Sequence, residues 1–336
     1  MRRLFILFND NHSVVVTIKS APNEIGGEGY IYRINFPHHG WCILKLYKTK
    51  DKAIKNRDKI LTLVRKSKPE TKNANIRFCW PIGIAYEENR TEFAGFVMPE
   101  AFPNSRDLYI LEYYGIGSSI KEEFPDDNAW HGKYELNSSR GLRNRLAILH
   151  NWAAALAVLH KSGEYILGDI KPTNVMVEPN MGKVSIIDID SCQVMVNGKV
   201  IFTRTAQTPT YRPPEISAKT GHNPIGESYD SFSFGVSAYT ILTGTHPFSN
   251  CRLLPPYNTE EYASITNCIK AGLSPIGANR NYTQRIANYD LHKNLQRLPT
   301  SLQNVFIMTF NGTNRPSMKA WKEALKNAIV QLDKQS

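Results

Sequence analysis

A stretch near the middle of the chain, Leu167–Asp190, carries polar residues whose types and spacing could do chemistry. Asp169 and Asn174 stand before one short apolar run, and Asp188 lies at the end of a second. Two apolar runs around a turn predict a β-hairpin with polar groups at both ends. Carboxylate and amide oxygens can hold Mg²⁺ and orient a hydroxyl, which is the equipment of phosphoryl transfer. A hairpin with merely solvated polar ends is the plain alternative.

A glycine-rich turn and a lysine within a strand, both near the N-terminus, could bind the phosphates that such chemistry requires. Gly27 and Gly29 lie in the segment Ile25–Ile34, where glycine allows backbone N–H groups to approach a phosphate closely. The next segment, Trp41–Tyr47, predicts a strand in which Lys45 stands among apolar residues and needs a partner for its charge. A bound phosphate would supply that partner. An ordinary hairpin turn and an edge lysine that reaches solvent are the simpler explanations.

The composition describes a folded protein with a basic surface. Of 336 residues, 41% are hydrophobic and 21% charged, which is ordinary for a soluble globular protein, and the formal net charge is +11. A basic surface attracts phosphates, acidic proteins and nucleic acids, so charge alone does not choose among them. The lysines are dispersed and form no basic arm, so we expect no nucleic-acid module.

The cysteines and the apolar segments indicate the cellular compartment that we expect for the protein. There are five cysteines, an odd number, and none forms a C-x-x-C pair, so neither a zinc site nor a disulfide framework is predicted. The first apolar run, Leu4–Phe8, is too short for a signal-peptide core, and no run reaches the length of a membrane span. We therefore expect a cytoplasmic protein with no membrane segment.

Apolar periodicity divides the chain into a strand-rich first part and a mainly helical second part. Met98–Ala101 interrupts the strand pattern and is predicted to be a linker. The predicted strands are Leu4–Phe8, Val14–Ile18, Trp41–Tyr47, Cys79–Ile84 and Glu92–Met98, with a short helix at Lys52–Lys66. The second part is predicted to hold helices at Asn144–Ser162, 228–243, 258–271, 299–310 and 317–333, and a polar surface insert at 121–140.

In this order the motifs resemble those of the eukaryotic-type protein kinases, over roughly residues 20–333. The segment Thr208–Glu215, TPTYRPPE, resembles the end of a serine/threonine kinase activation segment, and Asp230–Gly235, DSFSFG, resembles the helix that anchors the catalytic loop. Arg315 resembles the arginine that, in these kinases, pairs with the glutamate at the end of the activation segment, which is Glu215 in this chain. Within the family the chain is most similar to a bacterial branch whose members are often fused to a helix-hairpin-helix module. We expect that this chain ends too early to carry such a module.

The resemblance implies a fold and an activity. The fold is an α+β, bilobal protein-kinase-like fold, with an antiparallel β-sheet N-lobe over residues 1–98 and a mainly α-helical C-lobe over residues 99–336. The activity is that of a serine/threonine protein kinase, which transfers the γ-phosphate of ATP to a protein hydroxyl with the help of Mg²⁺. The implied partners are ATP, a protein substrate with a serine or threonine acceptor, and a cognate phosphatase.

The resemblance also implies catalytic roles for single residues. Asp169 would orient and deprotonate the acceptor hydroxyl, Lys171 would meet the γ-phosphate, and Asn174 would hold Mg²⁺. Thr208 would hydrogen-bond to both Asp169 and Lys171, and Glu215 would be the glutamate at the end of the activation segment.

Metal and nucleotide residues follow from the same resemblance. Asp188 would share the metal with Asn174. Asp190 stands where these kinases have a glycine, and it could be an outer ligand of the metal or a brake on the activation segment. The residues implied to contact ATP are Ile25, Gly27, Glu28, Gly29, Tyr30, Ile34, Ile43, Lys45, Met98, Glu100, Ala101 and Met176.

The chain departs from the family pattern at several places. Tyr32 replaces the third glycine of the loop, and Ile43 replaces an alanine and narrows the adenine slot. Leu167 and Gly168 replace the histidine and arginine before the catalytic aspartate, so a phosphorylated activation loop has lost its usual anchor.

A further departure concerns the partner of Lys45, which in these kinases is a glutamate of the following helix. Residues 59–69 contain no acid. Asp58 comes early and Glu70 comes late beside a proline, so Lys45 could be held by either of these, by Asp188, or by nothing until ATP binds.

Two other functions fit parts of the pattern. The missing glutamate and the altered glycine loop suit a pseudokinase, a nucleotide-dependent interaction module without catalysis. Gly168-Asp169, Asn174 and the motif Asp188-Ile-Asp190 also resemble the aminoglycoside-type phosphotransferases, which act on small molecules. Lys171 and the TPTYRPPE segment argue against that group, because they build a platform for a protein substrate.

We predict that the enzyme does not depend on phosphorylation of its activation loop, because Gly168 offers no cation to hold a phosphate there. A variant with Thr203, Thr205 and Thr210 replaced by alanine should keep a rate of phosphate transfer close to that of the wild type. A collapse of that rate would refute the prediction.

Overall fold

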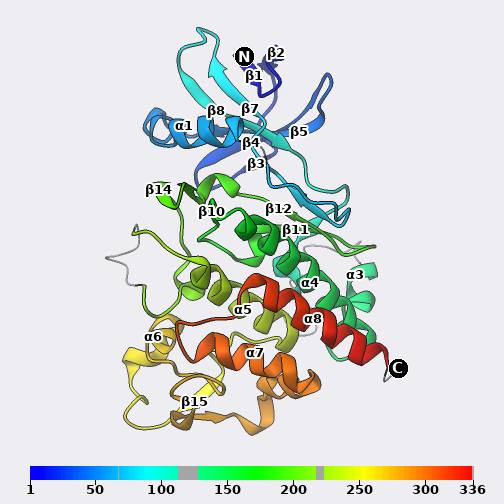
Figure 1. Ribbon diagram of the computed structural model, residues 1–336, viewed down its shortest axis with the longest axis vertical. Helices are drawn as coiled ribbons and strands as arrows, with labels where there is room; N and C mark the ends of the chain where they lie inside the picture. The colour runs from blue at the N-terminus through cyan, green and yellow to red at the C-terminus, as the bar shows by residue number, and fades with distance from the viewer. Residues whose placement is uncertain (67, 113–127, 217–222, 335–336) are drawn as a thin grey trace. The chain divides into compact units, whose positions relative to one another are not determined.

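The computed structural model describes residues 1–66, 68–112, 128–216 and 223–334, and the chain forms two compact units (Figure 1). The first unit comprises Met1–Glu70, Arg77–Ala101 and Ser185–Asp190, and the second comprises Thr71–Ile76, Phe102–Val184 and Ser191–Ser336. The short segment Ser185–Asp190 therefore belongs to the strand-rich unit, although the chain around it belongs to the helical one. The predicted division at residue 98 stays a prediction.

The first unit is built on a seven-stranded antiparallel sheet with the strand order β2-β1-β7-β8-β5-β4-β3. Its strands are rich in valine, isoleucine and aromatic residues, which pack well on a pleated surface. Their bounds are β1 Arg2–Phe8, β2 Ser13–Ile18, β3 Glu24–Ile25, β4 Gly29–Phe36, β5 Gly40–Tyr47, β7 Gly83–Glu87 and β8 Phe93–Pro99. Four predicted strands are confirmed, as β1, β2, β5 and β8.

One predicted strand is misplaced. Most of Cys79–Ile84 forms a connection between β6 (Ile76–Phe78) and β7. Pro81 lacks a backbone N–H and cannot take part in a ladder at that point. Trp80 is buried, and its indole N–H donates to the Leu63 carbonyl of the neighbouring helix at 2.9 Å. Backbone hydrogen bonds of the run lie on either side of Pro81, from Cys79 to Ile186 and from Ile82 to Val97.

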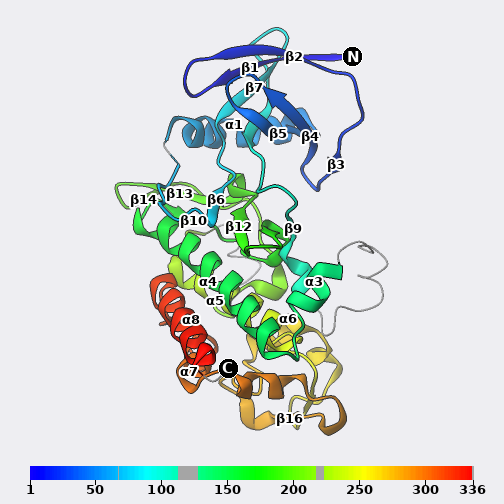
Figure 2. The same ribbon diagram turned by 90° about the vertical axis from the view of Figure 1, so that its right-hand side faces the viewer.

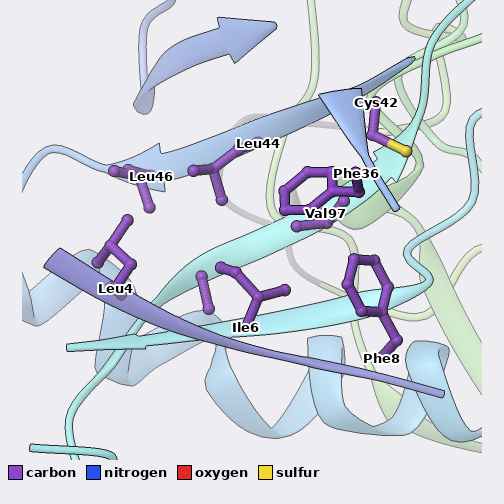
Figure 3. Close-up of a cluster of buried hydrophobic side chains, with 10 residues drawn as sticks. Leu4, Ile6, Phe8, Phe36, Cys42, Leu44, Leu46 and Val97 are labelled. Carbon is purple, nitrogen blue, oxygen red and sulfur yellow. The ribbon is translucent and has the colours of Figure 1, made fainter. Parts of the chain in front are cut away.

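The core of the first unit gathers on one face of the sheet (Figure 3). Alternate residues of β5 point into it, because successive side chains of a strand lie on opposite faces. Figure 3 shows Leu44 and Leu46 opposite Leu4 and Ile6 of β1, with Cys42 beside Phe36, and all six are buried. The alternation directs the other side chains of β5, including that of Lys45, to the opposite face.

Helix α1 (Lys50–Arg65) confirms the predicted short helix of the first unit. Thr49 caps its N-terminus by accepting a hydrogen bond from the Lys52 backbone N–H, and Asp51 stands in its first turn. Ile60, Leu63 and Val64 are buried on its inner side. The helix packs against β7 and β8, and so covers this part of the sheet.

Among its described residues, the second unit contains four helices of more than ten residues. They are α4 (Ser139–Lys161), α5 (Glu227–Thr243), α7 (Thr300–Phe310) and α8 (Met318–Asp333), and each was predicted from its pattern. Figure 2 shows α8, in red, running beside α4, in green, with which it packs closely. Helix α4 begins earlier than predicted because Ser138 caps it, and it ends before Gly163, whose φ of 65° suits glycine.

Two predictions for the second unit are corrected. Residues 258–271 form a 3-10 turn, Glu260–Ala263, and a separate short helix, α6 (Ile265–Lys270), because Ser264 adopts an extended backbone and caps α6. The predicted surface insert at 121–140 falls partly on residues 121–127, which lie outside the described residues. Beyond these, Trp130 of α3 (Asn128–Lys133) and Tyr134 are each 1% exposed, whereas Gly132, Asn137 and Arg140 are exposed, so this part lies at the surface but anchors two aromatic rings in the core.

The predicted hairpin is confirmed as β11 (Val175–Glu178) and β12 (Lys183–Ile186). In its turn the Glu178 carboxylate accepts hydrogen bonds from the backbone N–H groups of Asn180 and Met181, both at 2.8 Å. Gly182 has a φ of 65°, the left-handed conformation that glycine adopts without strain. None of the helices in the described ranges combines the length and the apolar character needed to cross a membrane.

Gly95 of β8 is predicted to be essential for the packing of β5. A Cβ atom there would lie 2.0 Å from the Lys45 carbonyl oxygen, which cannot move without breaking the ladder. We expect Gly95→Ala to lower the free energy of unfolding by about 1–3 kcal/mol, the usual cost of overpacking. Gly27→Ala is the matched control, because a Cβ at Gly27 meets nothing within 4 Å. Equal denaturation midpoints for the two variants would contradict the prediction.

Candidate active site

The first group of polar residues centres on Lys45, which is 7% exposed on β5. Its Nζ lies 2.9 Å from Asp188 Oδ1, and 3.0 and 2.9 Å from the two carboxylate oxygens of Asp190. Burial alone would lower the pKa of Lys45, but the charges of Asp190 and Asp188 outweigh it and raise that pKa, so the amine stays protonated. Two carboxylates around one ammonium leave a local charge that favours a further cation.

The partner of Lys45 comes from the segment after β12. Of the alternatives left open by the sequence, Asp188 is the one that contacts Lys45. Asp58 is exposed and pairs with Arg57 at 2.9 Å, and Glu70 is exposed. The sequence interpretation missed Asp190 as a partner of Lys45, although the absence of an acid in residues 59–69 together with the D-x-D spacing was a usable signal.

The local backbone explains how both aspartates reach the same lysine. Asp188 has a φ of 56°, a left-handed conformation that aspartate tolerates better than most residues. A 3-10 turn, Ile189–Ser191, follows at once and turns the chain. Asp190 is 4% exposed, and its burial raises its pKa, an effect that the charge of Lys45 opposes.

Tyr47 extends this group along the same face of β5 and was not singled out from the sequence. It is buried. Burial and the neighbouring carboxylates of Asp190, Glu28 and Asp188 raise the pKa of its hydroxyl well above the usual range. The hydroxyl therefore stays neutral and adds no charge to the cluster.

The glycine-rich segment forms the hairpin of β3 and β4, with Ile25 paired to Tyr30. Gly29 has to be glycine, because a Cβ there would lie 2.7 Å from the Leu46 carbonyl oxygen. Space over Gly27 is open. The turn is held by the Lys48 backbone N–H, which donates to the Glu28 carbonyl at 3.1 Å, so the backbone of the loop is shaped by β5.

The apolar residues expected to contact the adenine lie on the strands next to this loop. Ile34 of β4 and Ile43 of β5 are partly exposed, and Ile43 pairs with Met98 of β8. Met98 is buried. Met176, the remaining apolar residue of the expected set, lies on β11 in the second unit and pairs with Asp107 of β9 (Arg106–Asp107).

The linker after Met98 is fixed by two arginines. Arg77 Nη1 donates to the carbonyl oxygens of Glu100 and Ala101, at 2.9 and 3.2 Å. Arg33 pairs with the Glu100 carboxylate, with one contact at 3.1 Å, and stacks over Trp41. The carbonyl groups of Glu100 and Ala101 and the Glu100 carboxylate are thus engaged by arginine side chains.

The second group of polar residues lies in the second unit and centres on Asp169, which is buried. The Thr208 hydroxyl donates to Asp169 Oδ1 at 2.7 Å, and Lys171 Nζ lies 2.9 Å from Asp169 Oδ2 and 3.0 Å from Thr208 Oγ1. Asn174 Nδ2 donates to the Asp169 carbonyl at 2.8 Å. The structure thus brings these four predicted residues together, while their catalytic roles stay predictions.

Helix α5 holds the loop that carries Asp169. Asp230, fully buried near the start of α5, accepts hydrogen bonds from the backbone N–H groups of Leu167 and Gly168, at 2.9 and 2.8 Å. His160 at the end of α4 contacts the same carboxylate at 2.9 Å, which gives this histidine a structural role. One carboxylate therefore fixes the residues immediately before Asp169.

The segment after Thr208 is fixed at its far end by an ion pair. Arg315 Nη1 and Nη2 lie 2.6 and 2.9 Å from the two oxygens of Glu215, a bidentate arrangement that fixes direction as well as distance. The Arg315 guanidinium also stacks over Phe232 of α5. His246 contacts the Thr210 carbonyl at 3.0 Å, and burial lowers its pKa to about 4, so it is neutral at physiological pH.

The residues expected to hold a metal suit Mg²⁺ by their chemistry. Within the described ranges no group of three or more histidine, cysteine or acidic side chains could hold a metal by itself. Asp188, whose side chain is one-third exposed, offers a carboxylate in the first unit. Asn174 in the second unit uses its amide nitrogen toward Asp169, which leaves its amide oxygen for a cation. Mg²⁺ commonly takes one or two such oxygens and completes its shell with water and phosphate.

The fold and these groups agree with comparisons to known proteins. A family model described as "Protein kinase domain" matches residues 102–320. The chain therefore belongs to the protein kinase family. A crystal structure of a rhoptry kinase from Toxoplasma gondii superposes with a TM-score of 0.59 over 99% of this chain and 85% of that one, at 14% sequence identity. The predicted α+β, bilobal fold is confirmed.

Two relatives place the chain within the family. Protein kinase YegI of Escherichia coli K12 is 24% identical over 318 residues, which cover 92% of this chain and 44% of YegI. Serine/threonine-protein kinase mrck-1 of Caenorhabditis elegans is 34% identical over 165 residues, 47% of this chain and 9% of that protein. The chain spans less than half the length of these relatives. The predicted likeness to a bacterial branch of the family is confirmed.

Asp190 is predicted to set the nucleotide affinity by holding Lys45. Asp190→Asn keeps the shape but removes the charge, so Lys45 would draw more strongly on Asp188 and compete with the metal for it. We expect the affinity for Mg·ADP, measured by titration with a fluorescent analogue, to fall about tenfold, equivalent to ~1.4 kcal/mol. Asp58→Asn, which changes an exposed acid paired with Arg57, is the control and should bind as the wild type does. Unchanged affinity in Asp190→Asn would show that Asp188 alone suffices.

Proposed function

We propose that this chain is a serine/threonine protein kinase that transfers the γ-phosphate of ATP to a hydroxyl of a protein substrate. The contact between Thr208 and Asp169, 2.7 Å long, carries the proposal. It joins the segment that resembles a protein-substrate platform directly to the candidate catalytic base. The printed name of mrck-1, a serine/threonine-protein kinase, supports the same acceptor class.

In this proposal Asp169 orients the acceptor hydroxyl and takes its proton. Both of its carboxylate oxygens are engaged, one by Thr208 and one by Lys171, so the carboxylate is held in one orientation. A base positioned in this way contributes about 10²–10⁴ in rate. Lys171 carries a positive charge beside the base, where it would meet the incoming γ-phosphate.

The nucleotide is proposed to bind through the first unit. Backbone N–H groups of Gly27, Glu28 and Gly29 would cover the phosphates, and Lys45 would place its charge on the α- and β-phosphates. Asn174 and Asp188 would hold Mg²⁺, which neutralises charge on the phosphoryl group when it is bound. Ile25, Tyr30, Ile34, Ile43, Met98, Glu100, Ala101 and Met176 are the further residues proposed to contact the nucleotide.

The wider setting of the protein is part of the proposal. The five cysteines are free thiols, and burial raises the pKa of Cys79 and Cys251, each to about 12, so neither is a reactive thiolate. Free thiols suit a reducing compartment such as the cytoplasm. A phosphatase that removes the transferred phosphate would be the natural counterpart of the kinase.

A nucleotide-dependent interaction module without catalysis is the second candidate. The observation that favours it is the direct pairing of Lys45 with Asp188 and Asp190, which engages the lysine expected to meet the phosphates. Such a protein would bind nucleotide and change its affinity for a partner without transferring phosphate.

Asp169→Asn separates these functions. In a kinase we expect phosphate transfer to a generic basic protein to fall by at least about 100-fold, because the base is lost, while the affinity for Mg·ADP changes little. Asp333→Asn, an exposed acid paired with Arg143, is the control for a charge change of the same kind. Nucleotide binding by the wild type without turnover would favour the interaction module. Transfer to metabolites and not to proteins would favour a small-molecule phosphotransferase.

A further inference from the structure

Gly168, the residue before Asp169, lies against a side chain from a distant segment. Its φ is 72°, which favours glycine. A Cβ atom at this position would lie 2.7 Å from Arg204 Cδ, 3.2 Å from Arg204 Cβ and 3.0 Å from Ile225 Cδ1. The space where a side chain at Gly168 would begin is therefore filled by Arg204.

Arg204 is a buried cation with a defined set of contacts. It lies four residues before Thr208 and is 1% exposed. Its Nη1 donates to the Asn223 carbonyl at 2.9 Å, and its guanidinium carbon lies 4.9 Å from the ring centre of Tyr229 in the first turn of α5. Burial lowers the pKa of Arg204, whereas Tyr229 and Asp230 nearby oppose this and Arg212 adds to it. Stacking on an aromatic face suits a guanidinium better than an ammonium.

Residues 223–229, which Arg204 contacts, are also hydrogen-bonded to a second residue of the segment that carries Arg204. The Gln193 side chain donates to the Ile225 carbonyl at 2.8 Å and accepts from the Ile225 backbone N–H at 2.9 Å. The Thr205 backbone N–H donates to the Ser191 carbonyl at 3.0 Å. Gln193 belongs to β13 (Gln193–Val196), which pairs with β14 (Lys199–Phe202) just before Arg204. The segment is thus attached to the start of α5 on both sides of this hairpin.

We propose that Arg204 is a positioning residue that anchors the segment Ser191–Thr208 to Gly168, Asn223 and Tyr229, and that this anchor needs no phosphate. The proposal rests on the proposed kinase function. Arg204 supplies from the segment itself the cation that is missing at Gly168, and it holds in place the stretch that delivers Thr208 to Asp169. The guanidinium contacts a carbonyl and an aromatic ring, and the side chain fills the space beside Gly168, so no modification is needed for the anchor.

Removal of the guanidinium tests the anchor directly. We expect Arg204→Ala to speed amide hydrogen exchange over residues 199–216 and to lower kcat for a protein substrate about tenfold, with KM for ATP within about twofold of the wild type. Arg204→Lys keeps the charge but loses the planar stacking group, so it should recover only part of kcat. Lys199→Ala, an exposed cation on β14, is the control and should change neither readout. Wild-type exchange and kcat in Arg204→Ala would overturn the proposal.

A double-mutant cycle tests whether Arg204 fills the space at Gly168. Gly168→Ala should slow the enzyme through both its left-handed backbone and the collision with Arg204. In the Arg204→Ala background the collision is absent, so the same substitution should have a smaller effect on kcat. An equal effect in both backgrounds would show that the two residues are not coupled, contrary to the proposal.

Treatment of the wild type with a phosphatase tests the independence from phosphate. Two nitrogen atoms of Arg204, Nε and Nη2, have no hydrogen-bond partner in the described part of the chain, so a phosphorylated residue is the rival ligand. We expect kcat to be unchanged after treatment, with mass spectrometry showing residues 203–210 unmodified. Loss of activity would overturn the proposal. If the untreated wild type transfers no phosphate at all, the kinase function fails, while hydrogen exchange in Arg204→Ala still decides whether Arg204 holds the segment.

Discussion

A buried ammonium group that must always have a counter-charge governs the first unit. The alternation of β5 sends Cys42, Leu44 and Leu46 into the core and leaves Lys45 on the opposite face with almost no access to water. An unpartnered charge in that position would cost far more than a protein's stability allows. The left-handed backbone at Asp188 and the turn that follows satisfy this requirement, because they bring two carboxylates to the lysine. The segment Ser185–Asp190 accordingly belongs with the strands although its neighbours in sequence belong with the helices.

A buried carboxylate plays the corresponding part in the second unit. Asp230 accepts hydrogen bonds from two backbone N–H groups just before Asp169 and from His160, so the loop is fixed to α5, most of whose residues are buried. The same region of α5 receives the guanidinium of Arg204 over Tyr229. The loop that carries Asp169 and the segment that carries Thr208 are therefore both held by helix α5. Such shared support fixes the mutual geometry of Asp169 and Thr208.

The elements that were predicted correctly have strong local signals, and those that were not depend on partners distant in sequence. The alternation of β5 and the apolar stripe of α4 are enough to predict a strand and a helix, because each pattern marks the buried face of a regular element. Cys79–Ile84 is equally apolar, but its burial comes from Trp80 reaching α1, which no local pattern records. The kinase resemblance predicted contacts among Asp169, Lys171 and Thr208, whereas for the partner of Lys45 the sequence left Asp58, Glu70 and Asp188 open. That partner is set by a turn at Asp188, and a backbone dihedral cannot be read from residue types alone. The role of Arg204 could not be predicted either, because no residue near it in the sequence indicates a contact with Gly168.

The pairing of Lys45 with Asp190 has a consequence for how such an enzyme can be controlled from outside. Where the counter-charge of the lysine stands on a neighbouring helix, a partner or an inhibitor that rotates the helix withdraws that charge and disables the nucleotide site. Here the counter-charge stands on the same short peptide as the candidate metal ligand, and α1 contributes no acid to it. A compound that wedges α1 outward would leave the lysine and its two carboxylates in place. To withdraw the counter-charge of Lys45, a partner or a compound would have to disturb the Asp188–Asp190 turn itself.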